Sequence, residues 1–343
     1  MKVFYLQQQT AKRNNSFSPS ATKPALAVES WQQLGLPVDI VAFAPATREQ
    51  LYTVHDPNYV DGVLDLRRSN GFGNRLPEIA EALPYVAGSM VAATLHAYKT
   101  GETTFSPTSG AHHAGYDHGG GYCTFNFLAL AAVEVHKAGA KKVGIIDCDM
   151  HYGDGTAEII RTLGLHFVRH YSFGGDISCR ETAEQWLARL PALVQGIAQE
   201  VDVIIYNAGA DPHIDDPLGG VLTTVQLKQR DEIVFAASQM FNVPVAVSLA
   251  GGYQKDIREV LDVHDNTFKL ACRYASEVAP EAGRPLNTEQ KSPGTEALCA
   301  GDRESLIKAR TTKSRDLSRP LSSLSGSTLT FSSRQISSEQ QQA

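Results

Sequence analysis

A chain of 343 residues with 42% hydrophobic residues can form one large domain, or two small ones, with a sizeable buried core. Its formal net charge of −6 argues against a dedicated nucleic-acid-binding protein, which would carry a basic patch or stripe. It has no apolar run of the roughly 20 residues that a transmembrane helix needs, and the start MKVFYLQQQTAKRNN turns polar too early for a secretory signal, so we expect a cytoplasmic protein without a membrane partner.

Short apolar, β-branched runs alternate with longer helical patterns along the chain. In order, they predict a strand at 38–43, helices at 79–99 and 126–138, a strand at 143–147, a helix at 182–199, a strand at 201–206, a helix at 223–241, a strand at 243–249 and a helix at 260–275. Strands that are apolar on both faces and alternate with helices indicate a parallel sheet covered on both sides. We therefore expect a three-layer α/β/α domain with a mostly parallel central sheet.

The composition changes near Pro280. From there to Ala343 the chain is rich in Ser, Thr, Gln and Arg and has few apolar positions. Such a segment cannot bury enough apolar surface to offset the entropy lost on ordering it. We therefore expect a globular domain over residues 1–277 and a disordered, low-complexity tail over residues 278–343.

Polar side chains follow three of the predicted strands at the point where each strand ends. The run VGIIDCDMHYGDGT places Asp147, Asp149 and His151 at alternate positions, and extended chain sends alternate side chains to the same side. The run VDVIIYNAGADPH ends near Asp211, and the run VPVAVSLAGGY ends with Tyr253. Because ligands bind outside the carboxyl ends of strands in parallel α/β sheets, we expect a site at this edge.

The residues after the 143–147 strand favour a metal site. Each aspartate could instead be a helix N-cap, which is the common role of an aspartate after a strand. Two acids and a histidine within one short segment, however, repel unless a cation lies between them. Two carboxylates and one imidazole leave a fourth position for water, as in catalytic zinc sites. Oxygen-rich ligation favours one Zn²⁺ per chain and leaves Fe²⁺, Co²⁺ or Mn²⁺ as alternatives.

A second cluster, SGAHHAGYDHGGGYC, contains adjacent histidines on a short loop. The pair could be an exposed accident of that loop, and Tyr253 could be an ordinary core residue. A metal-activated water needs a base, however, and a leaving amine needs an acid, and histidine can serve as both near neutral pH. His112 and His113 with Asp147 and Asp154 would form two carboxylate–imidazole pairs, while Tyr253 could donate a hydrogen bond to a developing oxyanion.

Taken together, these segments resemble the histone deacetylase and acetylpolyamine amidohydrolase family, which has the arginase–deacetylase fold. The matching motifs are AHHA (111–114), GYCTFN (121–126), DCDMHYGDGT (147–156), GADPHIDDPLGG (209–220) and LAGGY (249–253), with a weaker match at TVHDPNYVDGV (53–63). The resemblance covers about residues 38–275. It implies a metal-dependent hydrolase that releases acetate and a free amine from an N-acetyl amide.

The resemblance also implies roles for individual residues. Zn²⁺ would be held by Asp149, His151 and Asp211. Among the catalytic residues, His113 would be the main base and acid, oriented by Asp154. His112, paired with Asp147, would act electrostatically. Tyr253 would polarise the acetyl carbonyl. The substrate-binding set would be Gly121 and Tyr122 along an acyl-lysine tunnel, Leu218 on the opposite wall, and Gly251 and Gly252. Family members often hold a monovalent cation such as K⁺ near 147–151, although the segment HFVRHYSFGG (166–175) lacks the usual Ser-Leu-His.

The sequence restricts the identity of the substrate less than it restricts the type of reaction. Leu218 is apolar, so the expected tunnel wall offers no acidic partner for the distant ammonium groups of a polyamine. This favours acyl-lysine or another amide with a neutral chain over an acetylpolyamine, and the expected partner is an acetylated small molecule or an acetyl-lysine protein. A ureohydrolase with two Mn²⁺ and an inactive module that binds acyl-lysine are the alternatives from the same fold, and the oligomeric state stays open.

Overall fold

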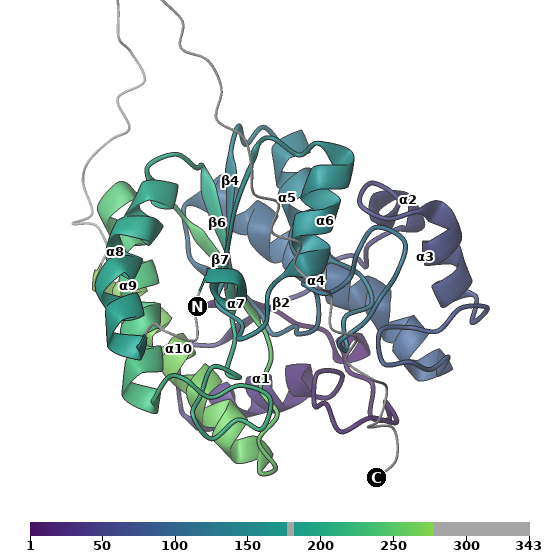
Figure 1. Ribbon diagram of the computed structural model, residues 1–343, viewed down its shortest axis with the longest axis horizontal. Helices are drawn as coiled ribbons and strands as arrows, with labels where there is room; N and C mark the ends of the chain where they lie inside the picture. Colours follow the sequence, from purple (N-terminus) through teal and green to yellow (C-terminus); the bar gives the residue numbers. More distant parts are fainter. Residues whose placement is uncertain (177–181, 278–343) are drawn as a thin grey trace, which may run out of the picture. The chain divides into compact units, whose positions relative to one another are not determined.

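The computed structural model describes residues 1–176 and 182–277 of the chain. The segment 278–343, for which the composition predicts disorder, lies outside the described residues. Within them, a seven-stranded sheet is covered by helices on both faces (Figure 1). Every pairing between neighbouring strands of this sheet is parallel. The predicted three-layer α/β/α fold is confirmed.

The strands lie in the spatial order β2-β1-β3-β7-β6-β4-β5. Their bounds are β1 (Lys2–Phe4), β2 (Asp39–Val41), β3 (Thr104–Ser106), β4 (Val143–Asp147), β5 (Val168–Ser172), β6 (Val203–Ala208) and β7 (Val245–Leu249). The central strands β4, β6 and β7 are buried along their whole length. Strands covered on both faces need apolar side chains at nearly every position, which explains their Val- and Ile-rich sequences.

Helices form the two outer layers. One face of the sheet is covered by α1 (Lys23–Gln33), α8 (Ala183–Ala198), α9 (Thr224–Phe241) and α10 (Ile257–Glu277), and the other by α4 (Pro77–Thr100), α5 (Phe127–Lys137) and α6 (Asp154–Leu163) (Figure 1). The remaining helices in the described chain are η1 (Gln7–Gln9), α2 (Arg48–Leu51), α3 (Pro57–Leu64) and α7 (Phe173–Asp176).

Strand β6 shows how the sequence divides between two cores. Val203 and Ile205 belong to the cluster packed under α4 and α5, whereas Ile204 and Tyr206 belong to the cluster packed under α8 and α9. Successive side chains of a strand point to opposite faces, so consecutive apolar residues fill both layers. Because β6 packs against helices on both faces, the chain that follows its carboxyl end starts from a rigid, buried strand.

Two of the long helices, α8 and α9, begin at recognisable capping residues. At the start of α8, the Thr182 side chain accepts a hydrogen bond from the Gln185 backbone and the Gln185 side chain accepts one from Thr182, which is a capping box. Thr223 and Gln226 form the same arrangement at the start of α9. These two helices were predicted to within a residue or two of their observed bounds, because their starts carry a local chemical signal.

The sequence patterns missed most of the short elements. Strands β1 and β3 have three residues each, too few to show a periodicity. Strand β5, with the sequence VRHYS, carries Arg169 and His170 because it lies at the edge of the sheet and need not be apolar throughout. Four central strands, β3, β7, β6 and β4, lie side by side, and their carboxyl ends carry the predicted site residues.

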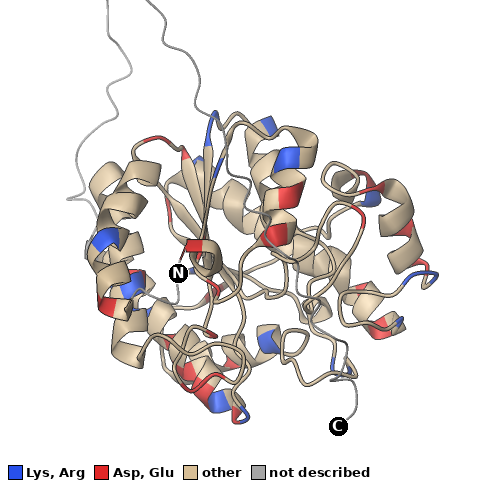
Figure 2. Cartoon of the chain, in the orientation of Figure 1, with Lys and Arg blue, Asp and Glu red and all other residues tan. Residues whose placement is uncertain are grey.

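Charged side chains of both signs are scattered over the helices and loops of the described chain (Figure 2). Basic residues alternate with acidic ones rather than lining one stripe in this view. None of the described helices is long and apolar enough to cross a membrane.

The outer layer is anchored by an aromatic stack between α1 and α10. Trp31 is fully buried, lies parallel to Phe268 with ring centroids 4.3 Å apart, and meets Phe105 of β3 edge-on at 5.5 Å. We expect Trp31→Ala to lower the free energy of unfolding by about 3–5 kcal/mol, since it leaves a large cavity. Urea unfolding would measure this change. Val225→Ala, at a position that is 73% exposed, should change stability by less than about 0.5 kcal/mol, and an equal loss in both variants would contradict the assignment.

Candidate active site

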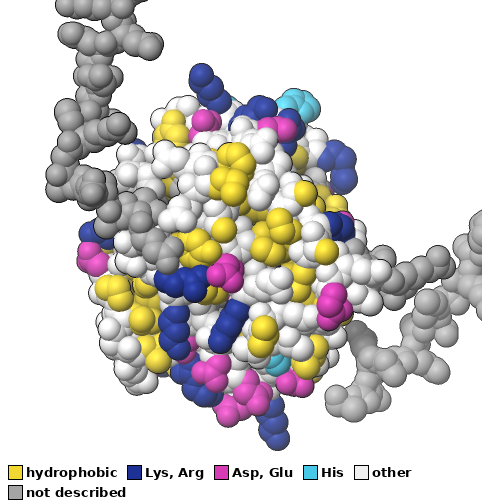
Figure 3. All heavy atoms as spheres, turned by 90° about the vertical axis from the view of Figure 1, so that its left-hand side faces the viewer, with side chains coloured by type: hydrophobic (Ala, Val, Ile, Leu, Met, Phe, Trp, Pro, Cys, Tyr) yellow, Lys and Arg dark blue, Asp and Glu magenta, His cyan; other side chains and the backbone are white. Residues whose placement is uncertain are grey.

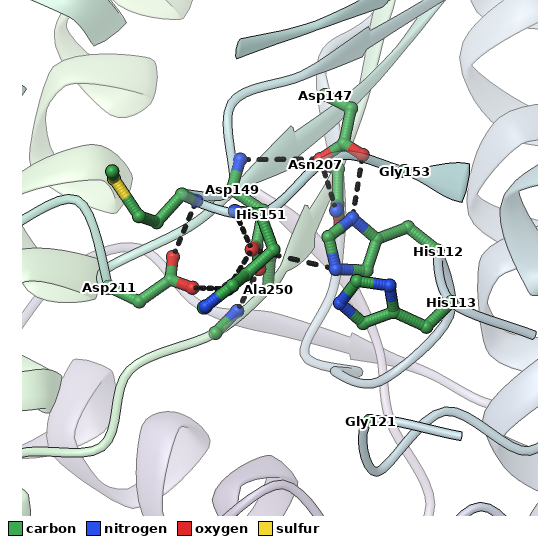
Figure 4. A network of polar contacts seen from close by, with 12 residues as sticks. His112, His113, Gly121, Asp147, Asp149, His151, Gly153, Asn207, Asp211 and Ala250 are labelled. Atoms are coloured by element: carbon green, nitrogen blue, oxygen red, sulfur yellow. Dashed lines mark hydrogen bonds and ion pairs between the residues drawn. The ribbon is translucent and has the colours of Figure 1, made fainter. Parts of the chain in front are cut away.

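Three side chains with metal-ligand chemistry meet at the carboxyl ends of β4 and β6. Asp149 and His151 follow β4, and Asp211 follows β6. The His151 Nδ1 atom lies 3.2 Å from Asp149 Oδ1 and 3.0 Å from Asp211 Oδ2 (Figure 4). One ligand atom from each residue lies within 4.8 Å of the others. The structure therefore brings together the three residues that the sequence predicts as metal ligands.

Backbone amides hold both carboxylates in place. Gly251 N donates to Asp149 Oδ2 at 2.7 Å, and Met150 N donates to Asp211 Oδ1 at 3.1 Å. A Cβ atom on Gly251 would collide with the Asp211 carboxylate and lie 2.9 Å from Asp149 Oδ2. The predicted role of Gly251 beside the site thus has a steric basis, because any side chain there would fill the space next to the two acids.

The electrostatics of this group call for a cation. Asp149 and Asp211 are 2% and 0% exposed, so both carboxylates are almost fully desolvated. Burial and the neighbouring Asp149 raise the pKa of Asp211. Hydrogen bonds to Asp149 and Asp211 raise the pKa of His151 to about 10. Two buried carboxylates and an imidazole facing them form a donor set that fits a divalent metal, whose charge would take the place of the His151 proton.

Asp147 lies beside this group and points away from it. Its Oδ2 atom accepts from His112 Nδ1 at 2.8 Å, and its Oδ1 atom accepts from Asn207 Nδ2 at 2.8 Å (Figure 4). The expectation that Asp147, Asp149 and His151 converge is therefore only partly correct. Strand β4 ends at Asp147, and the chain turns before Asp149. Hydrogen bonds from His112 and Asn207 stabilise the Asp147 carboxylate.

Asn207 was missed by sequence reasoning, although a signal exists. It ends β6 and is the direct partner of Asp147 across the β4–β6 ladder. The same row continues to Ser248 of β7, whose hydroxyl donates to Asn207 Oδ1 at 2.8 Å. Reading the strands in register, with Asn two positions before the Gly209 turn, would have placed this amide beside the acid.

The two histidines of the 111–114 motif form the predicted carboxylate pairs. His112 is buried and bound to Asp147, while His113 Nδ1 lies 2.7 Å from Asp154 Oδ1. Their rings are 4.1 Å apart, and Figure 4 shows both beside the acidic group. Although burial lowers it, Asp149 and Asp147 raise the pKa of His112 to about 10, whereas burial and the charge of His112 lower the pKa of His113. The neighbouring imidazoles therefore have opposite electrostatic environments.

Asp154 is the first residue of α6 rather than its N-cap, which is Gly153. Its Oδ1 atom accepts both from His113 and from Gly155 N. The alternative reading of Asp154 as a simple helix cap is thus incomplete, since the same carboxylate also orients an imidazole.

Gly121 and Tyr122 form the wall next to His113. Both have left-handed backbones, with φ values of 53° and 63°. A Cβ atom at Gly121 would lie 2.6 Å from the His113 ring, so glycine is required there by both conformation and space. Tyr122 N donates to Gly71 O at 3.0 Å, which fixes the tyrosine in its strained conformation.

The turn that carries Tyr253 is held from both ends. Lys23 Nζ and Ser109 Oγ donate to Ala250 O at 2.6 and 2.8 Å. At the other end, Tyr253 N donates to Asp216 Oδ2 at 2.7 Å. Between them, Gly252 has a φ of 145°, which favours glycine.

Lys23 and Asp216 were not predicted as site residues. Asp216 lies inside the GADPHIDDPLGG motif, so its position carried a signal. It also accepts from Leu218 N at 2.9 Å, and one carboxylate therefore ties the Leu218 segment to the tyrosine. Lys23 lies in a polar N-terminal segment with no motif around it, and only the fold places its fully buried ammonium at this turn.

The tyrosine itself borders the site. Burial, with Asp149 and Asp211 nearby, raises the pKa of Tyr253, so its hydroxyl keeps its proton. Its ring lies 5.8 Å from that of Tyr122. Leu218, predicted on the opposite wall, is 40% exposed, and the adjacent Gly219 packs against the Asp211 backbone.

A second group in the described chain could also hold a metal, formed by Asp117, His118 and Glu158. Asp117 and His118 are exposed, and water already solvates their charges. The pair His118–Asp117, at 3.1 Å, belongs to the surface class that contributes little energy. The buried Asp149 group is the better metal candidate, because its charges are withdrawn from solvent.

Comparison with known proteins agrees with these motifs. Residues 19–173 match the family model described as the histone deacetylase domain. The chain is 29% identical over 249 residues to an uncharacterized protein of Picosynechococcus, covering 65% of this chain and 82% of the relative. It is 25% identical over 281 residues to histone deacetylase 2 of Arabidopsis thaliana, covering 71% and 70% of the two chains.

The fold is shared with a solved structure. An acetylpolyamine aminohydrolase from Burkholderia pseudomallei superposes with a TM-score of 0.62 at 17% sequence identity, over 79% of this chain and 98% of the other. This likeness supports the arginase–deacetylase architecture. In sequence, the chain is similar to the histone deacetylase domain over residues 19–173, and it therefore resembles the histone deacetylase and acetylpolyamine amidohydrolase family in both sequence and fold.

Proposed function

We propose that this chain is a Zn²⁺-dependent amidohydrolase that removes acetyl groups from amines, with acyl-lysine as its preferred class of substrate. One observation carries the proposal: Asp149, His151 and Asp211 lie in one polar network with two carboxylate-paired histidines, next to a protonated tyrosine. This is the set of groups that metal-assisted amide hydrolysis requires.

The metal would be held by the two aspartates and the histidine. Bound there, Zn²⁺ would act as a Lewis acid toward the carbonyl and lower the pKa of a bound water to about 7. A monovalent cation such as K⁺ near 147–151 stays a prediction from the family resemblance.

His113 is suited to move the proton. Asp154 occupies its Nδ1 side, which leaves Nε2 to accept a proton from the attacking water and to return it to the leaving amine. Its lowered pKa keeps it neutral, as a base must be before attack. His112, whose two nitrogens face Asp147 and Asp149, is positioned to stabilise charge rather than to shuttle protons.

Tyr253 would hold the carbonyl oxygen. Its hydroxyl stays protonated and can donate a hydrogen bond to the oxyanion that forms on attack. The hydrogen bonds at the two ends of the 250–253 turn fix the backbone that carries this side chain, since Lys23 holds one end and Asp216 holds the other.

The substrate assignment rests on the walls of the site. Tyr122, Leu218 and the Tyr253 ring present apolar surface, which suits the methylene chain of an acylated lysine. A polyamine would carry further ammonium groups, for which these three residues offer no carboxylate partner. An acetylpolyamine or another small N-acetyl amide is the alternative substrate.

Removing one proposed ligand tests the metal. We expect Asp211→Ala to abolish stoichiometric Zn²⁺ binding and deacetylation together, because one carboxylate and one imidazole bind too weakly. Elemental analysis after dialysis would measure the metal content. His118→Ala, in the exposed second cluster, should keep one Zn²⁺ per chain. Two metals per active chain would instead point to ureohydrolase-type chemistry.

Changing the tyrosine separates chemistry from metal binding. Tyr253→Phe should retain Zn²⁺ and the fold but lower kcat by about a hundredfold to a thousandfold, the cost of one oxyanion donor in other enzymes. Initial rates on an acetyl-lysine peptide would measure kcat and KM. Full turnover by this variant would exclude Tyr253 from the reaction.

Lys23 can be tested as a positioning residue. Lys23→Met removes the ammonium that holds Ala250 O, and we expect kcat to fall by up to about a hundredfold through misplacement of Tyr253. KM and Zn²⁺ content should change little, and Lys23→Arg should restore part of kcat. An unchanged kcat in the Met variant, or a fall that merely tracks a loss of melting temperature, would contradict this role.

A further inference from the structure

Phe17 is an exposed aromatic residue at the edge of the site. Its side chain is 63% exposed, which is unusual for a residue of this size. Its ring meets Tyr122 edge-on, with centroids 5.4 Å apart, and lies 5.9 Å from the Tyr253 ring. Since both tyrosines border the site, Phe17 extends their aromatic surface outward toward solvent.

The loop that carries Phe17, residues 14–18, is held by hydrogen bonds within the loop. Asn14 Nδ2 donates to Ser18 O at 2.6 Å, and Asn14 Oδ1 accepts from Ser16 N at 2.9 Å. Asn14 and Ser18 are both buried, and Asn15 takes up the turn with a left-handed φ of 53°. Buried polar residues therefore hold the backbone of this loop in a conformation that exposes the apolar Phe17 side chain to solvent.

The same loop is tied to both walls of the site. Asn74 Nδ2 donates to Asn14 O at 2.7 Å, and Asn74 belongs to the turn whose Gly71 O holds Tyr122. On the other side, Ser109 Oγ, which contacts Ala250 O, lies 3.3 Å from Ser20 Oγ. Phe17 is thus fixed relative to Tyr122 and Tyr253 together.

Met240 is an exposed apolar residue whose surroundings differ from those of Phe17. On the face shown in Figure 3, hydrophobic side chains occur in small groups among charged ones. Met240, near the end of α9, is 65% exposed and precedes the amino end of β7, whereas the predicted site residues follow the carboxyl end of that strand. Scattered residues of that kind are normal on a protein surface. Phe17, unlike Met240, contacts two of the predicted site residues, Tyr122 and Tyr253.

We propose that Phe17 is a specificity-determining residue, which forms the outer wall of an aromatic collar with Tyr122 and Tyr253. The collar receives the unbranched methylene chain of the amine half of the substrate. The inference rests on the proposed deacetylase function and states which feature of the substrate is recognised: an unbranched methylene chain on the acetylated amine, as in the lysine side chain. The three rings carry no formal charge, and the exposed face of Phe17 offers apolar contact along such a chain.

A chain-length series tests the collar. The full-length protein, loaded with Zn²⁺, would be assayed with N-acetylpropylamine and N-acetylhexylamine, and the ratio of the two kcat/KM values would be compared between variants. The variants are Phe17→Ala, Phe17→Leu and the matched control Met240→Ala. Because Phe17 is exposed, none of these changes should alter the melting temperature.

We expect the wild-type ratio to favour the longer amide, and Phe17→Ala to lower this ratio about tenfold, which corresponds to about 1.4 kcal/mol. Phe17→Leu should recover part of the ratio through its apolar side chain, and Met240→Ala should match the wild type. An unchanged ratio in Phe17→Ala would overturn the inference, and so would an equal loss in Met240→Ala.

A binding measurement separates this inference from the proposed function. Calorimetric titration with hexylamine and propylamine, the product amines, needs no turnover. If the wild type hydrolyses neither amide, the proposed function fails, while a weaker preference for hexylamine in Phe17→Ala would still support the collar. Equal affinities of the wild type and Phe17→Ala for hexylamine would refute it.

Discussion

The carboxylate of Asp147 is the point on which the site depends. It ends the buried strand β4, accepts from His112 on one side and from Asn207 on the other, and also faces the Asp149 amide at 3.3 Å. A buried acid without such donors would be protonated or would destabilise the fold. Because the donors come from three separate segments, satisfying this one charge fixes the relative position of β4, β6 and the histidine loop.

The sheet register extends this constraint across the molecule. Ser106, Ser248, Asn207, Asp147 and Ser172 are successive partners on β3, β7, β6, β4 and β5. This polar row lies at the carboxyl ends of the strands, of which the central β4, β6 and β7 are otherwise apolar, directly beneath the candidate ligands. A sheet that slipped by one position would turn these side chains into the helical layers, so the register of the fold and the assembly of the site are one requirement.

The sequence predicted the parts of the site that share a strand end or a motif. Asp149, His151 and Asp211 were identifiable because polar residues after buried strands must meet at one edge. The two carboxylate–histidine pairs were inferred because a metal-activated water needs a base, and the motif resemblance supplied the role of each histidine. Lys23, Asp216 and Asn207 were not identified, since their partners are backbone atoms or side chains chosen by strand order. Phe17 carried no pattern at all. Short strands such as β1 escaped for a similar reason, because three residues show no period and only pairing with β2 and β3 defines them.

The clamp by Lys23 has a consequence for how the protein is made. Lys23 and Ala250 lie 227 positions apart, and Ser30 bonds Asp265 across 235 positions. Contacts between residues so far apart in sequence are slow to form, because the chain must lose the entropy of closing a long loop before the contact stabilises it. During synthesis, the first helix must wait on the ribosome until nearly the whole domain has emerged. Until then, the Lys23 ammonium and the apolar face of α1, which are buried in the folded protein, stay exposed to solvent. The nascent chain therefore depends on protection from aggregation.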